Sequence, residues 1–158
     1  MSQLKSIKLL LLGTLAVGKT SLARRLSFNT FDADYKSTIG VQLHKLDVDV
    51  DGQTVSVVVW DTDGDLAADA LTSVYARGAA GALIVGDAVR PDTLTAVADL
   101  ANAMDETMPG RPCICVVNKI DAGAPDAERM NTIEATGRTV TRTSALNGEG
   151  VSEALDAL

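Results

Sequence analysis

Short apolar runs alternate with segments of helical length along this chain. The apolar runs at residues 7–12, 82–86, 112–117 and 139–143 predict buried strands. Helices are predicted between and after them, at residues 19–27, 91–104, 126–136 and 151–158. This alternation predicts an α/β fold of three layers, in which a mostly parallel sheet carries helices on both faces.

One pair of predicted strands departs from the alternation. Residues 43–50 and 54–60 are two apolar-rich runs separated by Asp51-Gly52. Asp-Gly between two alternating runs is a hairpin signal. We therefore expect one antiparallel strand at an edge of the sheet.

Length, charge and termini narrow the class of protein. The 158 residues fit a single domain, 1–158, and the net charge of −7 argues against partners such as nucleic acid or an anionic membrane. Ser2 excludes N-myristoylation, and neither a signal peptide nor a prenylation box is present, so we expect a cytoplasmic protein without a direct membrane anchor. The last predicted helix is short, so it is equally plausible that the chain is one domain of a longer protein.

The two cysteines, Cys113 and Cys115, are expected to be buried, reduced thiols.

Residues 13–20, GTLAVGKT, match the phosphate-binding motif GxxxxGK[ST] between a predicted strand and a predicted helix. Backbone N–H groups of such a loop point at phosphate oxygens. Gly18 allows close approach of the backbone, Lys19 places a cation on the β- and γ-phosphates, and the Thr20 hydroxyl is a ligand for Mg²⁺. The motif predicts a nucleotide phosphate site with Mg²⁺ as its cofactor.

A second motif, Asn118-Lys119-Ile120-Asp121, follows the apolar run at 112–117. Ligands of open α/β sheets bind at such strand ends. The Asp121 carboxylate can accept hydrogen bonds from both N1–H and the N2 amine of guanine, a pair that adenine does not offer. A backbone N–H of residues 144–146 is expected to reach guanine O6. The predicted ligand is therefore GTP or GDP.

The end of the run at 54–60 carries a third group of candidate residues. Asp61 is expected to hold Mg²⁺ through a bound water, and the Gly64 N–H to contact the γ-phosphate.

These elements together resemble the Ras superfamily of small GTPases, and the Rab family most closely, from Lys8 to about Leu155. The resemblance implies a doubly wound, six-stranded sheet, a GDP/GTP switch, and effector proteins that read two switch segments. It places Phe31 against the guanine and Tyr35 in the first switch. It makes Thr38 the second Mg²⁺ hydroxyl.

The resemblance also implies a surface for a protein partner: an effector, an exchange factor or an activating protein. This surface comprises residues 31–43 and 63–77. Leu43, Trp60 and Tyr75 fall on an aromatic triad that Rab effectors read, with Leu43 in place of Phe. Plain packing of Trp60 in its strand has near equal weight.

The chain departs from the family where hydrolysis is controlled. Asp65 occupies the position of the glutamine that orients the attacking water, and a carboxylate can only accept hydrogen bonds there. Asp63 adds a second negative charge, and Leu15 would crowd an arginine supplied by an activating protein. We expect slow GTP hydrolysis, unless a different residue, such as one from a partner, positions the water.

The candidate residues fall into three sets. Those expected to act in hydrolysis are Lys19, Thr38, Gly64 and Asp65. Those expected to hold Mg²⁺ are Thr20, Thr38 and, through water, Asp61. Those expected to bind the nucleotide are Gly13, Leu15, Ala16, Val17, Gly18, Lys19, Thr20, Ser21, Phe31, Tyr35, Thr38, Gly64, Asn118, Lys119, Asp121, Ser144, Ala145 and Leu146.

Two functions remain open at this stage. The first is a GTPase switch that hydrolyses GTP slowly and signals to an effector. The second is a non-hydrolysing binding module, a pseudo-GTPase that holds nucleotide as a structural or regulatory ligand. A nucleotide kinase is a distant third, because the chain has no insertion for an arginine-bearing lid.

Overall fold

The computed structural model describes residues 5–14, 16–28, 41–62 and 77–156. Each predicted strand and helix has a counterpart at its place in the chain. The strands are β1 (Lys5–Gly13), β2 (Val41–Val50), β3 (Gln53–Thr62), β4 (Ala79–Asp87), β5 (Cys113–Asn118) and β6 (Thr139–Arg142). The helices are α1 (Lys19–Phe28), α3 (Pro91–Thr107), α4 (Ala127–Glu134) and α5 (Val151–Asp156).

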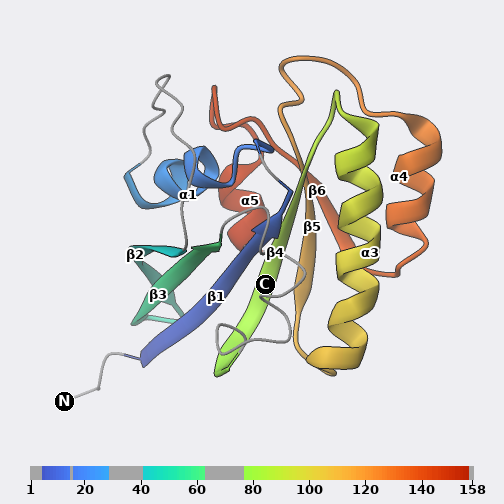
Figure 1. Ribbon diagram of the computed structural model, residues 1–158. Coiled ribbons are helices and arrows are strands. Elements are labelled where there is room, and N and C mark those ends of the chain that lie inside the picture. Colours follow the sequence, from blue (N-terminus) through green and yellow to red (C-terminus); the bar gives the residue numbers. More distant parts are fainter. Residues whose placement is uncertain (1–4, 15, 29–40, 63–76, 157–158) are drawn as a thin grey trace.

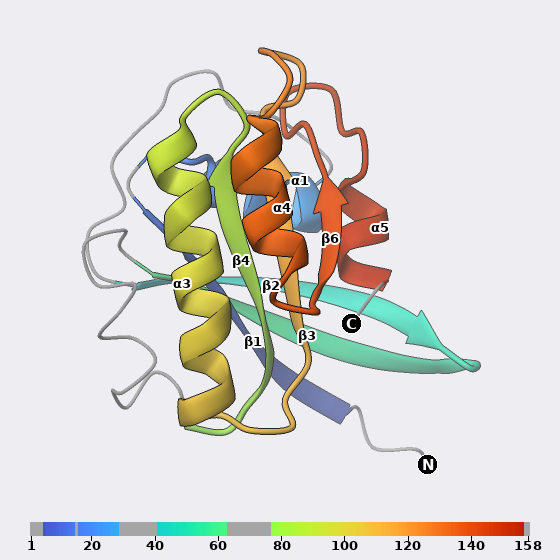
Figure 2. The same cartoon turned by 90° about the vertical axis from the view of Figure 1, so that its right-hand side faces the viewer.

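The strands form one sheet of six, in the order β2-β3-β1-β4-β5-β6. β2 pairs with β3 in antiparallel register around the Asp51-Gly52 turn, and the other neighbours are parallel. The predicted α/β class, the six-stranded sheet and the antiparallel edge strand are confirmed. Figure 2 shows β2 and β3 running side by side to their shared turn.

The sheet separates two apolar cores. Figure 1 shows α1 and α5 on one face of the sheet and α3 and α4 on the other. Because successive side chains of a strand point to opposite faces, Leu9 and Leu11 of β1 join the α1/α5 core, whereas Leu10 and Leu12 join the α3/α4 core. The central strands are therefore apolar at nearly every position, as expected for strands that are covered on both faces.

Local chemistry explains where two of the helices begin. Pro91 starts α3, where its missing N–H is not needed. Asp126 caps α4, since its side chain accepts a hydrogen bond from the Arg129 N–H at 3.3 Å. No helix among the described residues is long and apolar enough to cross a membrane.

The two cysteines are buried, as predicted from the sequence, and both lie on the side of β5 that faces the α3/α4 core. A hydrogen bond to Cys115, followed by burial, raises the pKa of the Cys113 thiol. The same hydrogen bond lowers the pKa of Cys115.

β4 is longer than the apolar run that predicted it. The strand begins at Ala79 rather than at residue 82, because Lys8 and Leu9 of β1 pair with Ala79 and Gly81. Alanine and glycine have low intrinsic strand preference, so only this pairing reveals the start of the strand.

The strand order marks one edge of the sheet as the place for a ligand. From β1, the chain runs through α1 to β2 and β3 on one side, then crosses back to β4 on the other side of β1. Open α/β sheets bind ligands at the carboxyl ends of the strands where the order reverses in this way. The loop after β1 is the GTLAVGKT segment.

Candidate functional site

The loop after β1 is held tightly against its neighbours. A Cβ at Gly13 would lie 2.4 Å from the Val85 carbonyl oxygen, and a Cβ at Gly18 would lie 2.4 Å from the Asn118 side-chain nitrogen. Gly13 and Gly18 have positive φ angles of 151° and 97°. Glycine is therefore required at positions 13 and 18 by contact as well as by backbone conformation.

Lys19 folds back onto the loop that precedes it. Its ammonium donates hydrogen bonds to the carbonyl oxygens of Gly13 at 3.0 Å and Thr14 at 3.2 Å. The residue is only 7% exposed. A buried cation is thus held in the phosphate-binding motif, where its charge acts at close range.

Thr20, the first residue after that lysine, contacts the end of β3. Its hydroxyl donates to Asp61 Oδ2 at 2.6 Å. Asp61 is fully buried, and its second oxygen, Oδ1, has no hydrogen-bond partner among the described residues. A buried carboxylate oxygen without a partner, beside a hydroxyl, fits Mg²⁺ or a water bound to it, because Mg²⁺ prefers oxygen ligands in octahedral geometry.

His44, the one histidine of the chain, also faces this carboxylate. It lies on β2, and its Nε2 atom is 3.7 Å from Asp61 Oδ2, without a hydrogen-bond partner in the described part of the chain. No sequence motif joins the two residues, because their contact depends on the β2–β3 register.

Asn118 connects the phosphate motif to the base motif. Its side-chain nitrogen donates to the Val17 carbonyl at 3.0 Å. Its side-chain oxygen accepts from the Thr143 hydroxyl at 2.9 Å and from the Ala145 N–H at 3.2 Å. One buried carboxamide therefore holds the loop after β1, the end of β5 and the segment after β6 together.

Lys119 makes a second bridge to the phosphate motif. Its ammonium donates to the Ala16 carbonyl at 2.8 Å and lies 3.2 Å from Asp87 Oδ2. Asp87 is buried at the carboxyl end of β4, and sequence reasoning did not select it. A carboxylate that ends a fully apolar strand was the signal that could have identified it.

Asp121 borders a cavity of about 150 Å³ at the same edge of the sheet. The Ser144 hydroxyl donates to Asp121 Oδ1 at 2.7 Å, which links the two segments that line the cavity. The lining residues are Ser21, Asn118, Lys119, Asp121, Ala122, Ala145 and Leu146. All but Ala122 were selected from the sequence, so the structure brings these predicted residues together.

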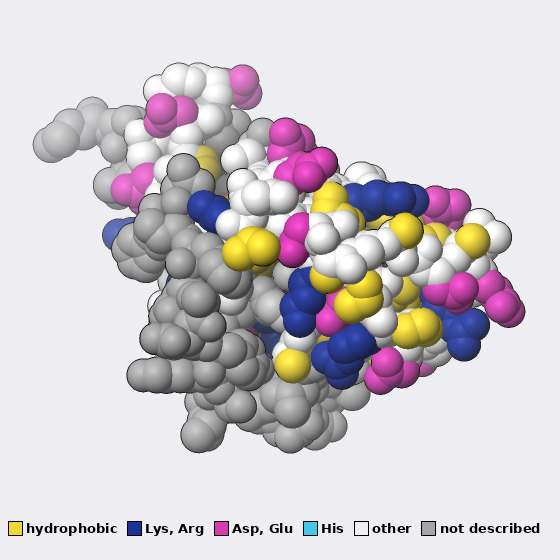
Figure 3. Space-filling model, turned by 90° about the horizontal axis from the view of Figure 1, so that it is seen from above, with side chains coloured by type: hydrophobic (Ala, Val, Ile, Leu, Met, Phe, Trp, Pro, Cys, Tyr) yellow, Lys and Arg dark blue, Asp and Glu magenta, His cyan; other side chains and the backbone are white. Residues whose placement is uncertain are grey.

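The end of the molecule that bears these loops mixes basic and acidic side chains. In Figure 3 the basic and acidic side chains of the described residues are interspersed with hydrophobic ones, and neither positive nor negative charge predominates. The positive groups of the site are thus local, as expected for a chain with a net charge of −7.

Leu43 and Trp60 face each other across the β2–β3 hairpin. Leu43 is 59% exposed, whereas Trp60 is partly buried against the α3/α4 core. Part of the Trp60 side chain therefore serves the packing of the fold. The Lys8 ammonium lies 3.8 Å from the centre of the Trp60 ring and donates to the Arg77 carbonyl at 2.9 Å. This arrangement is a cation–π contact.

Several predicted residues lie outside the described part of the chain. They are Leu15, Phe31, Tyr35, Thr38, Asp63, Gly64, Asp65 and Tyr75. Their proposed roles remain predictions from the sequence. Among the residues that are described, no group of three or more His, Cys, Asp or Glu side chains forms a metal cluster.

Comparison with known proteins gives one consistent result. The model of the Ras family matches residues 8–158. The Ras-related protein Rab11E of Lotus japonicus is 40% identical over 115 residues, which cover 72% of this chain and 53% of that protein. RABA5b of Arabidopsis thaliana is 46% identical over 90 residues, or 57% of this chain and 42% of that protein. Rab11D of Lotus japonicus is 36% identical over 152 residues, or 93% and 70%. The chain thus spans about half the length of the first two relatives.

Proposed function

Because the chain belongs to the Ras family, with Rab proteins among its relatives, we propose that it is a guanine-nucleotide-dependent switch. In this proposal it binds GTP or GDP with Mg²⁺, hydrolyses GTP slowly, and signals to a protein effector through residues 31–43 and 63–77. The observation that carries the proposal is the meeting of a phosphate loop, the hydrogen bond between Thr20 and the buried Asp61, and the Asp121 cavity at one edge of the sheet.

In this proposal, different described residues bind the phosphates and the base of the nucleotide. Lys19 supplies a cation to the β- and γ-phosphates, and the backbone of residues 13–20 supplies N–H donors. Asp121 accepts from the guanine edge, while Asn118 and Lys119 fix the loops around it. Release of Lys19 from the Gly13 and Thr14 carbonyls accompanies its engagement with phosphate.

Thr20 and the free oxygen of Asp61 are the described groups that would hold Mg²⁺. The metal ion, when bound, neutralises phosphate charge and orients the phosphates. Thr38 supplies the second hydroxyl in the family pattern.

Slow hydrolysis follows from three residues of the sequence. Asp65 stands in place of the water-orienting glutamine, Asp63 adds negative charge close to it, and Leu15 obstructs an incoming arginine. A carboxylate cannot donate to the phosphoryl oxygens, and it repels the anionic γ-phosphate.

Single-turnover hydrolysis of GTP tests this part of the proposal. Asp65→Gln should hydrolyse GTP roughly 10²-fold faster than the native protein, the effect typical of one well-placed donor. Asp69→Asn is the matched control, because it removes a carboxylate from the same segment but not from that position. A native rate equal to or above that of Asp65→Gln would refute impaired hydrolysis.

A non-hydrolysing pseudo-GTPase is the second candidate, favoured by Asp63 and Asp65 together. The nucleotide that co-purifies separates the two. GDP with slow turnover of added GTP supports the switch, whereas GTP that persists over hours supports the binding module. A protein that neither retains nor binds guanine nucleotide would refute both.

A further inference from the structure

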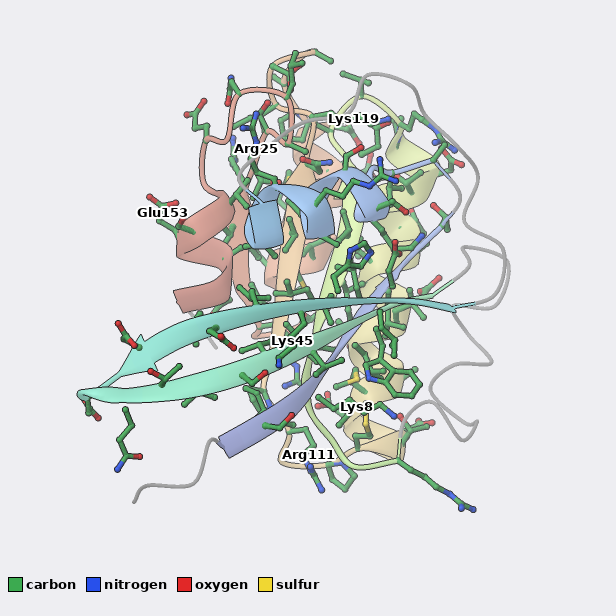
Figure 4. The ribbon with its side chains drawn as sticks, turned by 90° about the vertical axis from the view of Figure 1, so that its left-hand side faces the viewer. Lys8, Arg25, Lys45, Arg111, Lys119 and Glu153 are labelled. Carbon is green, nitrogen blue, oxygen red and sulfur yellow. The ribbon has the colours of Figure 1, made fainter. Side chains whose placement is uncertain are left out.

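Arg25, on α1, reaches across to the segment between β6 and α5. Its Nε atom donates to the Ala145 carbonyl at 3.0 Å, and Nη2 donates to the Leu146 carbonyl at 2.5 Å. Figure 4 shows Arg25 beside this segment, at the same end of the molecule as Lys119. The planar guanidinium can bind two consecutive carbonyls in this way, whereas a lysine ammonium acts as a single point.

A glycine, Gly148, lies opposite Arg25. A Cβ at Gly148 would lie 3.7 Å from Arg25 Nε, and Gly148 has a φ angle of +86°. The Gly148 N–H donates to the Ser144 carbonyl at 2.7 Å, which closes the segment on itself. The guanidinium thus packs against a compact turn.

These contacts fix the direction of the backbone donors on the other side of the turn. In a trans peptide the N–H points opposite to the carbonyl, so holding the Ala145 carbonyl turns the Leu146 N–H away from Arg25. The Ala145 N–H donates to Asn118, and the Asn147 N–H donates to the Ser144 hydroxyl. Within the described residues, the Leu146 N–H has no such partner, and Leu146 lines the cavity.

The same cavity is bordered by Asp121 from the opposite segment. Its two sides therefore differ in chemistry: a carboxylate that accepts hydrogen bonds and a backbone that donates them. Guanine has the matching pattern, with N1–H and the N2 amine as donors and O6 as the acceptor.

We propose that Arg25 is a positioning residue for guanine recognition, which holds the Ala145 and Leu146 carbonyls so that the Leu146 N–H meets O6. This inference rests on the proposed function. It also explains how α1 contributes to both parts of the ligand, because the helix that begins with Lys19 and Thr20 ends beside the base segment.

The experiment compares two nucleotides in the full chain with Mg²⁺: GDP, and the diphosphate of 2-aminopurine riboside, which lacks O6 and the N1 proton but keeps the N2 amine. Arg25→Ala should release GDP about tenfold to hundredfold faster, since two hydrogen bonds from a charged group are lost. Release of the analogue should change less than threefold, so the preference for GDP shrinks. Arg25→Lys keeps the positive charge but loses the planar guanidinium that binds two carbonyls, so its rate of GDP release should lie between those of the native protein and Arg25→Ala. Arg129→Ala, which loses exposed ion pairs on α4, should behave as native.

The outcomes separate this inference from the proposed function. Native protein that does not bind GDP contradicts the function itself. Native binding with unchanged GDP release in Arg25→Ala overturns the role of Arg25. Equal acceleration for both nucleotides also overturns it, because a general loosening of the fold does not distinguish bases. If Arg25→Ala does not fold, the same comparison in Arg25→Lys decides.

Discussion

Asn118 offers the sharpest test of how this site is built. The residue is 1% exposed, and its carboxamide makes three hydrogen bonds, to Val17, Thr143 and Ala145. Replacement by alanine removes all of them and leaves a buried carbonyl, hydroxyl and N–H without a partner, because water has little access to these positions.

The expected cost follows from these contacts. Each buried polar group that loses its partner costs about 1–3 kcal/mol. The groups are neighbours and can relax together, so we expect Asn118→Ala to lower the free energy of unfolding by roughly 3–6 kcal/mol. That is a large part of the roughly 5–15 kcal/mol that stabilises a typical domain. Asn118→Asp should destabilise the protein at least as much, because a carboxylate oxygen would then face the Val17 carbonyl oxygen and neither atom can donate a hydrogen bond.

The assay is urea denaturation at several concentrations of GDP. Bound ligand adds RT ln(1 + [L]/Kd) to stability, so the series separates loss of fold stability from loss of nucleotide affinity. Asn102→Ala, at an exposed position on α3, is the control and should shift stability by no more than about 0.5 kcal/mol. A loss below about 1 kcal/mol in Asn118→Ala, with an unchanged slope, would show that the carboxamide does not hold the loops together.

Three further outcomes are expected. Gly86→Ala should lower the free energy of unfolding by about 1–3 kcal/mol, because a Cβ there would lie 2.8 Å from a Val97 methyl; an unchanged urea midpoint would contradict this. Asp121→Asn should weaken GDP binding, measured by titration, by roughly 10²-fold, since an amide cannot accept both guanine donors; equal affinity would remove Asp121 from the base site. Cys113 and Cys115, both buried, should react with a thiol reagent such as DTNB only as fast as the protein unfolds, and rapid labelling of the native protein would show that β5 opens locally.

The features that could be predicted from the sequence are those that depend on residues close together in the chain. The GTLAVGKT and Asn118–Asp121 motifs are read from local spacing, and Asp51-Gly52 located the hairpin because turn chemistry is local. The apolar runs predicted the strands since burial on both faces leaves a continuous signal.

The rest depends on contacts between distant residues. The Arg25 hydrogen bond to Ala145 spans 120 positions, and that of Lys119 to Ala16 spans 103. Nothing in the residues around Arg25 distinguishes it from a solvent-exposed arginine on a helix. His44 and Asp61 are likewise joined only by the register of β2 and β3. One sequence contains no signal for such pairs until the strand order is known.

Trp60 has a practical consequence for anyone who studies this chain in solution. It is the single tryptophan, so the indole emission of the protein arises from one place. The Lys8 ammonium lies over its ring and donates a hydrogen bond to the carbonyl of Arg77, which directly follows residues 63–76. Displacement of Arg77 would move the charge relative to the ring and change the emission. Any displacement of Arg77 that accompanies the binding of a guanine nucleotide would therefore be visible in the intrinsic fluorescence, with an unmodified protein and unlabelled nucleotide.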